Sequence, residues 1–268
     1  MNKIQKSTLI GVSAIVLSTL GIQASDIVNG IQTNFSGMVI GSDGPCGSGS
    51  TEVLFGQYAL CVDMYEASAS KACPNPEPEN QLQTQDNVYE SDCKPVSQEN
   101  VLPWRYVSLT QAQQLCARSG KRLPTNEEWY KIAGGISDES TCTTDNGSSP
   151  AKTGTDGCIT SSGVYDMIGN VWEWVDEQVV GGIYDNRQLP ETGFVALVDK
   201  NGVVLETSSY ENKEFGNDYA WTNADGVFGI IRGGFYSSGD DAGIFAQNMS
   251  VPLNFKTAGV GFRCVKDI

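Results

Sequence analysis

Residues 163–177 read GVYDMIGNVWEWVDE, and the end of this stretch has the pattern of a β-strand. Trp172 and Trp174 are two residues apart, so on an extended backbone both indoles lie on one side and the Glu173 carboxylate lies on the other. Paired tryptophans of this kind commonly pack into a core. Taken alone, the stretch is interpreted as core aromatics beside a solvated acid.

Capping residues predict two helices before this strand. Ser108 is followed three residues later by a glutamine, and apolar residues then recur at helical spacing until Gly120. Thr125 is followed three residues later by Glu128, and a second apolar stripe ends at Gly134. Each is a capping box with a glycine stop, so both helices are expected.

Strands are predicted elsewhere along the chain. Residues 53–65 alternate and are rich in β-branched and aromatic side chains. Phe194–Val198 and Val203–Thr207, joined through Asn201-Gly202, form a predicted hairpin, and a last short strand is expected at Gly261–Val265. The expected class is α+β, with two main helices, short strands and many loops.

Composition excludes several classes of function. The 268 residues are 40% hydrophobic and 18% charged, which is typical of a folded protein. There are 17 lysines and arginines against 32 acidic residues, a net charge of −15, so nucleic acid is not expected as a partner. The chain contains no histidine, which excludes a Ser-His-Asp triad, a His-based zinc site and a histidine general base.

The N-terminus has the layout of a secretory signal. Lys3 and Lys6 precede an apolar run over residues 7–21, and Ala24 and Ser25 follow it. The domain prediction is a signal peptide over residues 1–24, a flexible segment over 25–52 and one folded domain over 53–268. An uncleaved N-terminal anchor is the alternative. No later stretch is apolar enough to span a membrane, so a secreted, cell-surface or periplasmic protein is expected.

An even number of cysteines in an exported chain favours disulfide bonds. Two pairs, Cys73 with Cys93 and Cys142 with Cys158, bracket polar loops that bury little apolar surface, and a disulfide closing each loop would replace missing core. Sequence alone does not fix the connectivity. All eight are predicted to be disulfide-bonded: Cys46, Cys61, Cys73, Cys93, Cys116, Cys142, Cys158 and Cys264.

Four segments occur in a fixed order: GKRLPTNEEW (120–129), GVYDMIGNVWEWVDE (163–177), IRGGFYSSGDDAGIFAQN (231–248) and VGFRCV (260–265). Together they resemble the formylglycine-generating enzyme, or sulfatase-modifying factor, family, from about Phe55 to Val265. The resemblance implies a C-type lectin-like fold and a disulfide between Cys116 and Cys264. Within this group, the chain looks like the non-catalytic variable proteins that are diversified by retroelements.

The resemblance also implies a structural calcium ion. In family members the segment around Asn170 wraps calcium, so here the Asn170 side chain, the Val171 carbonyl and Glu173 would be ligands. Calcium prefers such oxygen ligands. Two arginines in this acidic chain, Arg232 and Arg263, are expected to form salt bridges in the scaffold rather than to contact a substrate.

Catalysis of the family type is not expected. The enzymes hold copper(I) with two cysteine thiolates a few residues beyond the Arg-Gly-Gly turn, and soft thiolates suit that ion. Here Phe235–Gly243 contains no cysteine, and the histidines of the iron-dependent relatives are absent. No copper is therefore expected.

The C-terminal loops, about residues 235–259, form the predicted binding face. Aromatic side chains alternate there with small polar groups, a composition typical of adaptable binding surfaces. The alternative is ordinary loop and half-buried core. The predicted ligand-binding residues are Phe235, Tyr236, Ser237, Ser238, Asp240, Asp241, Phe245, Gln247, Asn248, Met249 and Asn254.

The main functional hypothesis is an exported protein that binds a protein or glycan ligand on a cell or particle surface. The alternatives are a formylglycine-generating-type oxidase acting on a sulfatase cysteine, and a structural or adhesion component of a surface.

Overall fold

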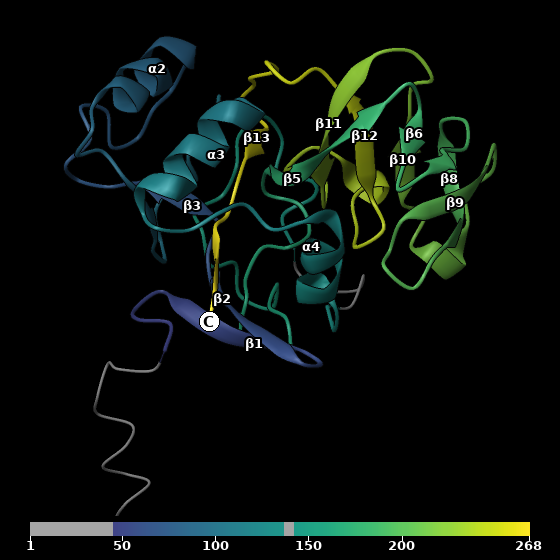
Figure 1. The fold of residues 1–268 in the computed structure, drawn as a ribbon, viewed down its shortest axis with the longest axis horizontal. Helices are drawn as coiled ribbons and strands as arrows, with labels where there is room; N and C mark the ends of the chain where they lie inside the picture. The colour runs from purple at the N-terminus through teal and green to yellow at the C-terminus, as the bar shows by residue number, and fades with distance from the viewer. Residues whose placement is uncertain (1–44, 137–141) are drawn as a thin grey trace, which may run out of the picture. The chain divides into compact units, whose positions relative to one another are not determined.

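The computed structural model describes residues 45–136 and 142–268 (Figure 1). The predicted signal peptide, and most of the predicted flexible segment, lie outside these residues. Within the described ranges, no helix is both long enough and apolar enough to cross a membrane.

Three α-helices lie in the described part of the chain: α2 (Gln81–Tyr89), α3 (Leu109–Arg118) and α4 (Asn126–Ala133). Both predicted capping boxes are present. The Ser108 hydroxyl accepts a hydrogen bond from the Gln111 N–H at the start of α3, and the Thr125 hydroxyl accepts one from the Glu128 N–H at the start of α4. Two 3₁₀ turns complete the helical elements, η1 (Lys213–Phe215) and η2 (Gly239–Asp241).

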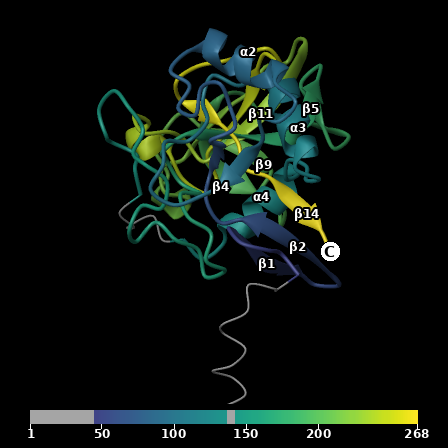
Figure 2. The same ribbon diagram turned by 90° about the vertical axis from the view of Figure 1, so that its left-hand side faces the viewer.

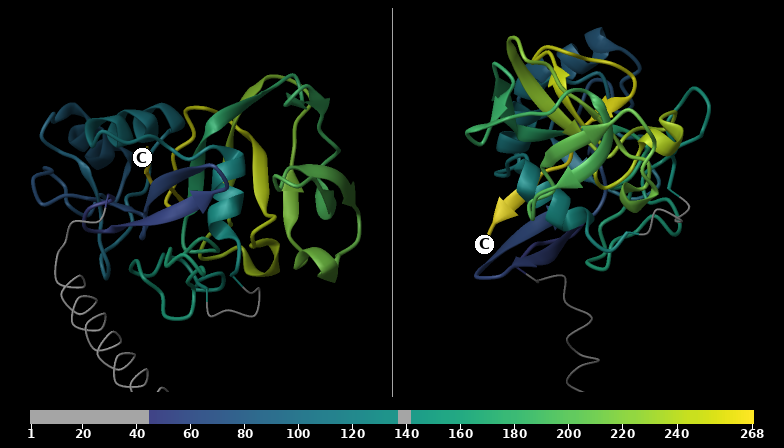
Figure 3. Two further views of the ribbon diagram at one scale, coloured as in Figure 1. Left: turned by 60° about the horizontal axis from the view of Figure 1, so that its bottom comes forward. Right: turned by 90° about the vertical axis from the view of Figure 1, so that its right-hand side faces the viewer.

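The largest sheet has the strand order β7-β6-β5-β11-β12-β10-β8-β9, with β13 paired to β5. Figure 3 shows the yellow strand β12 lying among strands from earlier in the chain. Its strands are β5 (Trp172–Val180), β6 (Ile183–Tyr184), β7 (Arg187–Gln188), β8 (Gly193–Val198), β9 (Val204–Ser208), β10 (Tyr219–Trp221), β11 (Val227–Arg232), β12 (Gln247–Val251) and β13 (Val260–Gly261).

A second sheet joins the two ends of the folded unit. It contains β1 (Ser50–Phe55), β2 (Tyr58–Asp63) and the last strand β14 (Val265–Asp267), in the order β1-β2-β14. Figure 2 shows β14 beside β2 at the bottom of the molecule. A small third sheet pairs β3 (Ala67–Ala69) with β4 (Pro95–Ser97).

Strand β5 separates two apolar cores. Trp172 and Trp174 pack into one core together with α3, which confirms that both indoles lie on one side of the strand. Val175 and Val179, on the other side, pack into a second core with Trp129 of α4. The quoted stretch is therefore the central partition of the domain, with α3 on one face and α4 on the other.

All eight cysteines form disulfides, in the pairs Cys46–Cys61, Cys73–Cys93, Cys116–Cys264 and Cys142–Cys158. The two loop pairs and the pair implied by the resemblance are confirmed. The Cys116–Cys264 bond links residues 148 apart in sequence and holds α3 against the end of the chain. In the chain-entropy model, closing a loop of that length stabilises the fold by about 5 kcal/mol.

The structure differs from the prediction at two places. The polar stretch between Cys73 and Cys93, expected to be a loop, contains helix α2, which the Asn80 side chain caps. The expected last strand Gly261–Val265 is divided, because Val260 and Gly261 pair with β5 whereas Val265 pairs with β2 of the other sheet. The predicted hairpin is confirmed as β8 and β9, which pair antiparallel.

The α+β class is confirmed. Two capped helices pack on a curled sheet, the first and last parts of the folded unit pair with each other, and a disulfide joins α3 to the residue before β14. This arrangement is the C-type lectin-like fold that the resemblance implies.

Candidate functional site

The predicted binding segment begins at a tight turn after β11. Gly233 and Gly234 have φ values of 91° and 87°, in the left-handed region that favours glycine. A Cβ on Gly234 would lie 2.3 Å from the Ala242 Cβ, so this position has no room for a side chain. The turn directs the chain into η2 and then into β12.

Part of the predicted binding face is exposed. Ser237, Asp240 and Asn254 are exposed, and Phe235, Ser238, Asp241, Phe245 and Asn248 are half-buried. Phe235 packs at the edge of the core under α3. Phe245 lies against two other rings, with centroids 5.9 Å from Tyr130 and 5.2 Å from Phe215.

Three of the predicted binding residues are buried, which corrects the prediction for them. Tyr236 is 7% exposed, and Gln247 and Met249 are fully buried. Gln247 and Met249 point inward because alternate side chains of β12 face the core. The Gln247 amide donates to the carbonyl oxygens of Gly202 and Phe245, so its role is structural. Asn248, between them, points to the opposite face.

Beside Asn248, a row of aromatic side chains crosses the sheet. The ring centroids of Phe194 and Tyr219 are 5.0 Å apart, those of Tyr219 and Trp221 are 4.8 Å apart, and those of Trp221 and Trp172 are 5.7 Å apart. We call these four residues the aromatic row. It extends from Trp172 in the core under α3 through Trp221 and Tyr219 of β10 to Phe194 of β8.

Strand register places the row on one face. Tyr219 pairs with Phe194, and Trp221 pairs with Asn248. Tyr219 and Trp221 are two residues apart on β10, so the side chains of both pairs lie on the same face of the sheet. Ala220, between the two β10 aromatics, faces the other way into a small core. Phe194, Tyr219 and Trp221 are half-buried. This face of the sheet therefore combines half-buried aromatic surface with the Asn248 amide.

Asn248 is positioned to offer a hydrogen-bond donor to this face. Its Oδ1 accepts hydrogen bonds from the N–H and the hydroxyl of Ser250, at 3.1 and 2.9 Å. Within the described part of the chain, its Nδ2 has no hydrogen-bond partner. Asn248 was predicted from the sequence, but Phe194, Tyr219 and Trp221 were not, although the alternation Tyr-Ala-Trp indicates two aromatic side chains on one face of a strand.

The predicted calcium segment forms a buried ion pair. Glu173 is 1% exposed, and its carboxylate accepts hydrogen bonds from the Arg263 Nε, at 2.8 Å, and from the Arg263 Nη2, at 2.6 Å. The Trp129 Nε1–H donates to the same carboxylate at 2.8 Å. The interpretation of Glu173 as a solvated acid is wrong, because the strand face opposite the tryptophans is also covered. The salt bridge expected for Arg263 is present.

The neighbouring Asn170 is buried in a different way. Its Nδ2 donates to Glu66 Oε2 at 2.5 Å, and the Val171 N–H donates to Glu66 Oε1 at 3.1 Å. Its Oδ1 is buried and has no partner among the described residues. Burial, together with the nearby Asp166 and Glu173 carboxylates, raises the pKa of Glu66 well above its ordinary value.

These contacts bear on the calcium hypothesis. The unpartnered Asn170 Oδ1 fits the role of an oxygen ligand. Glu173 does not fit, because a guanidinium and an indole N–H already use both of its oxygens. Moreover, no group of three or more acidic or cysteine side chains in the described residues is arranged to hold a metal ion. A calcium site at Asn170 and Val171 stays a prediction.

Arg232 has no carboxylate in an ion pair among the described residues. It is fully buried, and its guanidinium lies 5.0 Å from the Trp129 ring centroid and 6.0 Å from that of Tyr130. It donates to the Ile244 carbonyl at 2.8 Å. Burial lowers its pKa to about 10. The expected salt bridge is thus replaced by carbonyl and cation–π contacts, which hold the turn after β11.

The cysteines determine what metal chemistry the chain can support. Every cysteine sulfur is in a disulfide. Copper(I) requires soft ligands such as thiolates, and in this state the chain offers none. Around the Arg-Gly-Gly turn, the side chains supply only hydroxyl, carboxylate and aromatic groups.

Comparison with known families agrees with the sequence motifs. Residues 158–268 match the model of the sulfatase-modifying factor enzyme 1-like domain. The resemblance seen in the motifs is therefore confirmed for this C-terminal part of the chain. A curated relative, the inactive C-alpha-formylglycine-generating enzyme 2 of Bos taurus, is 31% identical over 120 residues. That alignment covers 36% of this chain and 40% of the relative.

Similar solved structures include the I1 variant of the major tropism determinant, with 16% identity, a TM-score of 0.45, and coverage of 82% of this chain and 53% of that one. Another is Treponema denticola variable protein 1, with 13% identity, a TM-score of 0.44, and coverage of 82% and 99%, respectively.

Proposed function

We propose that this protein is a non-catalytic, exported binding protein that captures a protein or glycan ligand on a cell or particle surface. The binding face consists of Phe194, Tyr219 and Trp221 of the aromatic row, Asn248 and the exposed part of residues 235–259, while Trp172 anchors the row in the core. The single observation that carries the proposal is the aromatic row. In it, Phe194 of β8 lies edge to face on Tyr219 of β10, Tyr219 contacts Trp221 in a tilted arrangement, and Trp221 is in register with Asn248.

The chemistry of the row supports binding. Aromatic side chains supply a large contact area while losing few rotatable bonds, and they are enriched at the energetic centres of interfaces. The rings contact one another, so their orientations are fixed before a ligand arrives. The free Nδ2 of Asn248 would add a directional hydrogen bond, which favours specificity.

Export is supported by the disulfides and by the N-terminal sequence. Four disulfides in one domain are typical of proteins from oxidising compartments. The lysines and apolar run of residues 1–21 have the pattern of a secretory signal. Diversification of the C-terminal region by a retroelement remains part of the hypothesis.

An array of glycans and surface proteins, probed with the purified protein, tests the binding face. We expect at least one ligand to be captured, and we expect Trp221→Ala and Tyr219→Ala to reduce capture at least tenfold. Tyr89→Ala is the matched control, since Tyr89 is an aromatic residue that is 77% exposed and belongs to α2 and not to the strands of the aromatic row. Equal capture by all four proteins would contradict this binding face.

A parallel assay tests the absence of catalysis. The purified protein should bind no stoichiometric copper and should not convert a cysteine-containing sulfatase peptide to formylglycine. The reason is that Ser237 and Ser238 stand where the family places thiolates, and a hydroxyl is a poor ligand for copper(I). Metal-dependent turnover of the peptide would refute the proposal and favour the oxidase alternative.

A further inference from the structure

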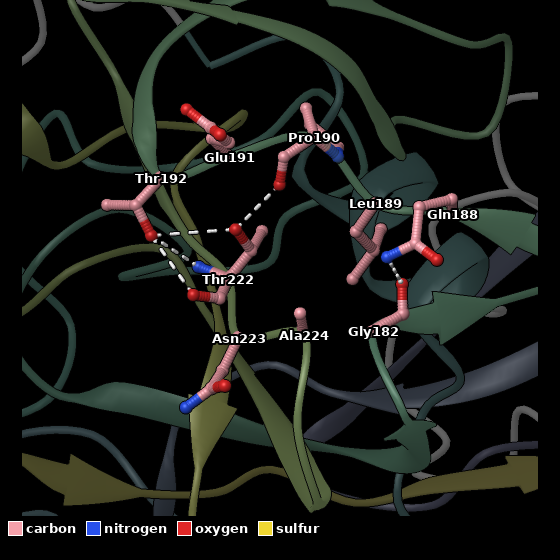
Figure 4. A pocket seen from close by; sticks show the side chains of 9 residues that line it. All are labelled: Gly182, Gln188, Leu189, Pro190, Glu191, Thr192, Thr222, Asn223 and Ala224. Carbon is pink, nitrogen blue, oxygen red and sulfur yellow. Dashed lines mark hydrogen bonds between the residues drawn. The ribbon is translucent and has the colours of Figure 1, made fainter.

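A pocket of about 440 Å³ is lined by residues of the β6–β7 hairpin, by the segment between β7 and β8, and by the residues that follow β10 (Figure 4). We call it the hairpin pocket. Its volume lies in the range of small-molecule sites, roughly 300–1,000 Å³. None of the predicted binding residues lines it, so it is separate from the binding face described above.

Hydrogen bonds fix the wall formed by the hairpin. The Gly182 carbonyl accepts from the Leu189 N–H at 2.9 Å and from the Gln188 Nε2 at 3.1 Å. A Cβ on Gly182 would lie 2.6 Å from that Nε2 and 2.9 Å from the Ala224 Cα. Glycine is therefore required where the hairpin approaches the opposite wall.

The opposite wall is fixed by two threonines. The Thr222 N–H donates to the Thr192 hydroxyl at 2.9 Å, and that hydroxyl donates to the Thr222 carbonyl at 3.1 Å. The Thr222 hydroxyl donates to the Pro190 carbonyl at 2.7 Å, which ties the strand end to the segment above the pocket. Because both walls are held by internal bonds, the pocket is formed in the absence of a ligand.

Other groups at the pocket remain free to bind. Within the described residues, the Gln188 Oε1, the Glu191 carboxylate and the Asn223 Nδ2 have no hydrogen-bond partner. Leu189 and Ala224 add apolar surface, and in Figure 4 their side chains face the space between the walls. The pocket thus combines hydrogen-bond donors and acceptors at its rim with an apolar floor.

Charge narrows the class of ligand. The pocket lining carries one carboxylate and, among the described residues that form it, no lysine or arginine. The whole chain has a net charge of −15, so an anion would be repelled. A neutral molecule with several hydroxyl groups and one C–H face matches both the amide and carboxylate groups and the apolar floor.

We propose that the hairpin pocket binds a small neutral polyhydroxylated ligand, in the size class of a pyranose sugar. The ring C–H groups pack on Leu189 and Ala224, and the hydroxyls exchange hydrogen bonds with Gln188, Glu191 and Asn223. This site does not depend on the aromatic row, so either proposal can fail without the other.

Saturation-transfer NMR on the full protein, with the methyl pyranosides of glucose, galactose, mannose and N-acetylglucosamine as probes, tests the pocket. At least one glycoside should show transfer and a dissociation constant in the millimolar range. Ala224→Phe, which fills the floor, should weaken that binding at least tenfold. Glu191→Gln should change it less than threefold, because a neutral ligand needs an acceptor and not a charge.

Two controls keep the test specific. Glu52→Gln, an exposed carboxylate on β1, should leave binding unchanged. Melting curves should show that Ala224→Phe folds, since Ala224 is exposed. The proposal is overturned if none of the four glycosides shows transfer, if Ala224→Phe binds like the wild type, or if Glu191→Gln abolishes binding, which would mean that the site requires a negative charge and not only an acceptor.

Discussion

The two halves of the large sheet use aromatic side chains for opposite purposes. At β5, Trp172 and Trp174 pack under α3, and Glu173 on the other face is neutralised by Arg263. At β10, Tyr219 and Trp221 lie in the same sheet but remain half-buried, beside an amide with a free donor. The motif at residues 163–177 covers most of β5, whereas none of the four quoted motifs includes β8 or β10, although the family match over residues 158–268 spans both strands. The motif residues on β5 build the scaffold, whereas the β8 and β10 aromatics of the proposed binding face lie outside the four motifs.

The strongest test of this difference is to replace one tryptophan in each half with alanine and to compare the losses of stability. Trp174→Ala should cost about 3–5 kcal/mol of unfolding free energy, because it removes a fully buried indole that also donates to the Val107 carbonyl. Trp221→Ala should cost only about 1 kcal/mol. Chemical denaturation of both variants measures the gap, and equal losses would show that the row is simply core.

Glu173→Gln should lower the unfolding free energy by about 3 kcal/mol, because it leaves the buried Arg263 guanidinium without a charge partner. The decrease should be the same in chelator and in millimolar calcium. Thermal melts of wild type and variant in both conditions provide the measurement. A stabilisation by calcium that disappears in the variant would instead make Glu173 a calcium ligand.

Glu66→Gln should instead raise the unfolding free energy near neutral pH. The folded pKa of Glu66 is raised, chiefly by burial and then by Asp166 and Glu173, so its contribution to stability is complete below its ordinary value of 4.5 and is lost as pH rises. The neutral glutamine avoids that loss. If the Asn170 side-chain amide flips by 180°, the glutamine Nε2–H can donate to Asn170 Oδ1. Urea unfolding at pH 4 and pH 7 should show the variant gaining on the wild type at the higher pH. A variant that loses stability equally at both values would argue against a raised pKa.

The smallest effect is expected at the exposed loops. Ser237→Ala and Asn254→Ala, made together, should change the unfolding free energy by no more than about 0.5 kcal/mol. If residues 235–259 contribute to the binding face, ligand capture should nonetheless decrease in the array assay. A large drop in melting temperature would indicate a structural role for these side chains.

Local signals in the sequence predicted most of the elements correctly. Capping boxes at Ser108 and Thr125 gave both helices because the cap and its partner are three residues apart. Helix α2 was missed because it is polar. It is held from outside, where Arg118 of α3 donates to the carbonyls of Val88 and Glu90 at its C-terminal end.

The site was harder to predict because it depends on pairing between distant strands. The burial of Gln247 and Met249 follows from the register of β12 with β10 and β11, which no local pattern fixes. The aromatic row joins residues from 172 to 221 that meet only in the folded sheet. By contrast, the absence of cysteine around Ser237 was readable directly, and it remains the basis for predicting no copper chemistry.

The disulfide between Cys46 and Cys61 has a mechanical consequence. Cys46 lies just before β1, and its partner lies within β2, so the bond bypasses the β1–β2 hairpin. A pulling force applied at residue 45 passes directly into β2 and then across to β14, which adjoins Cys264 and its link to α3. The hairpin therefore cannot be peeled open from that end. A domain tethered through its N-terminal side would transmit load to its centre through covalent bonds and one pair of strands.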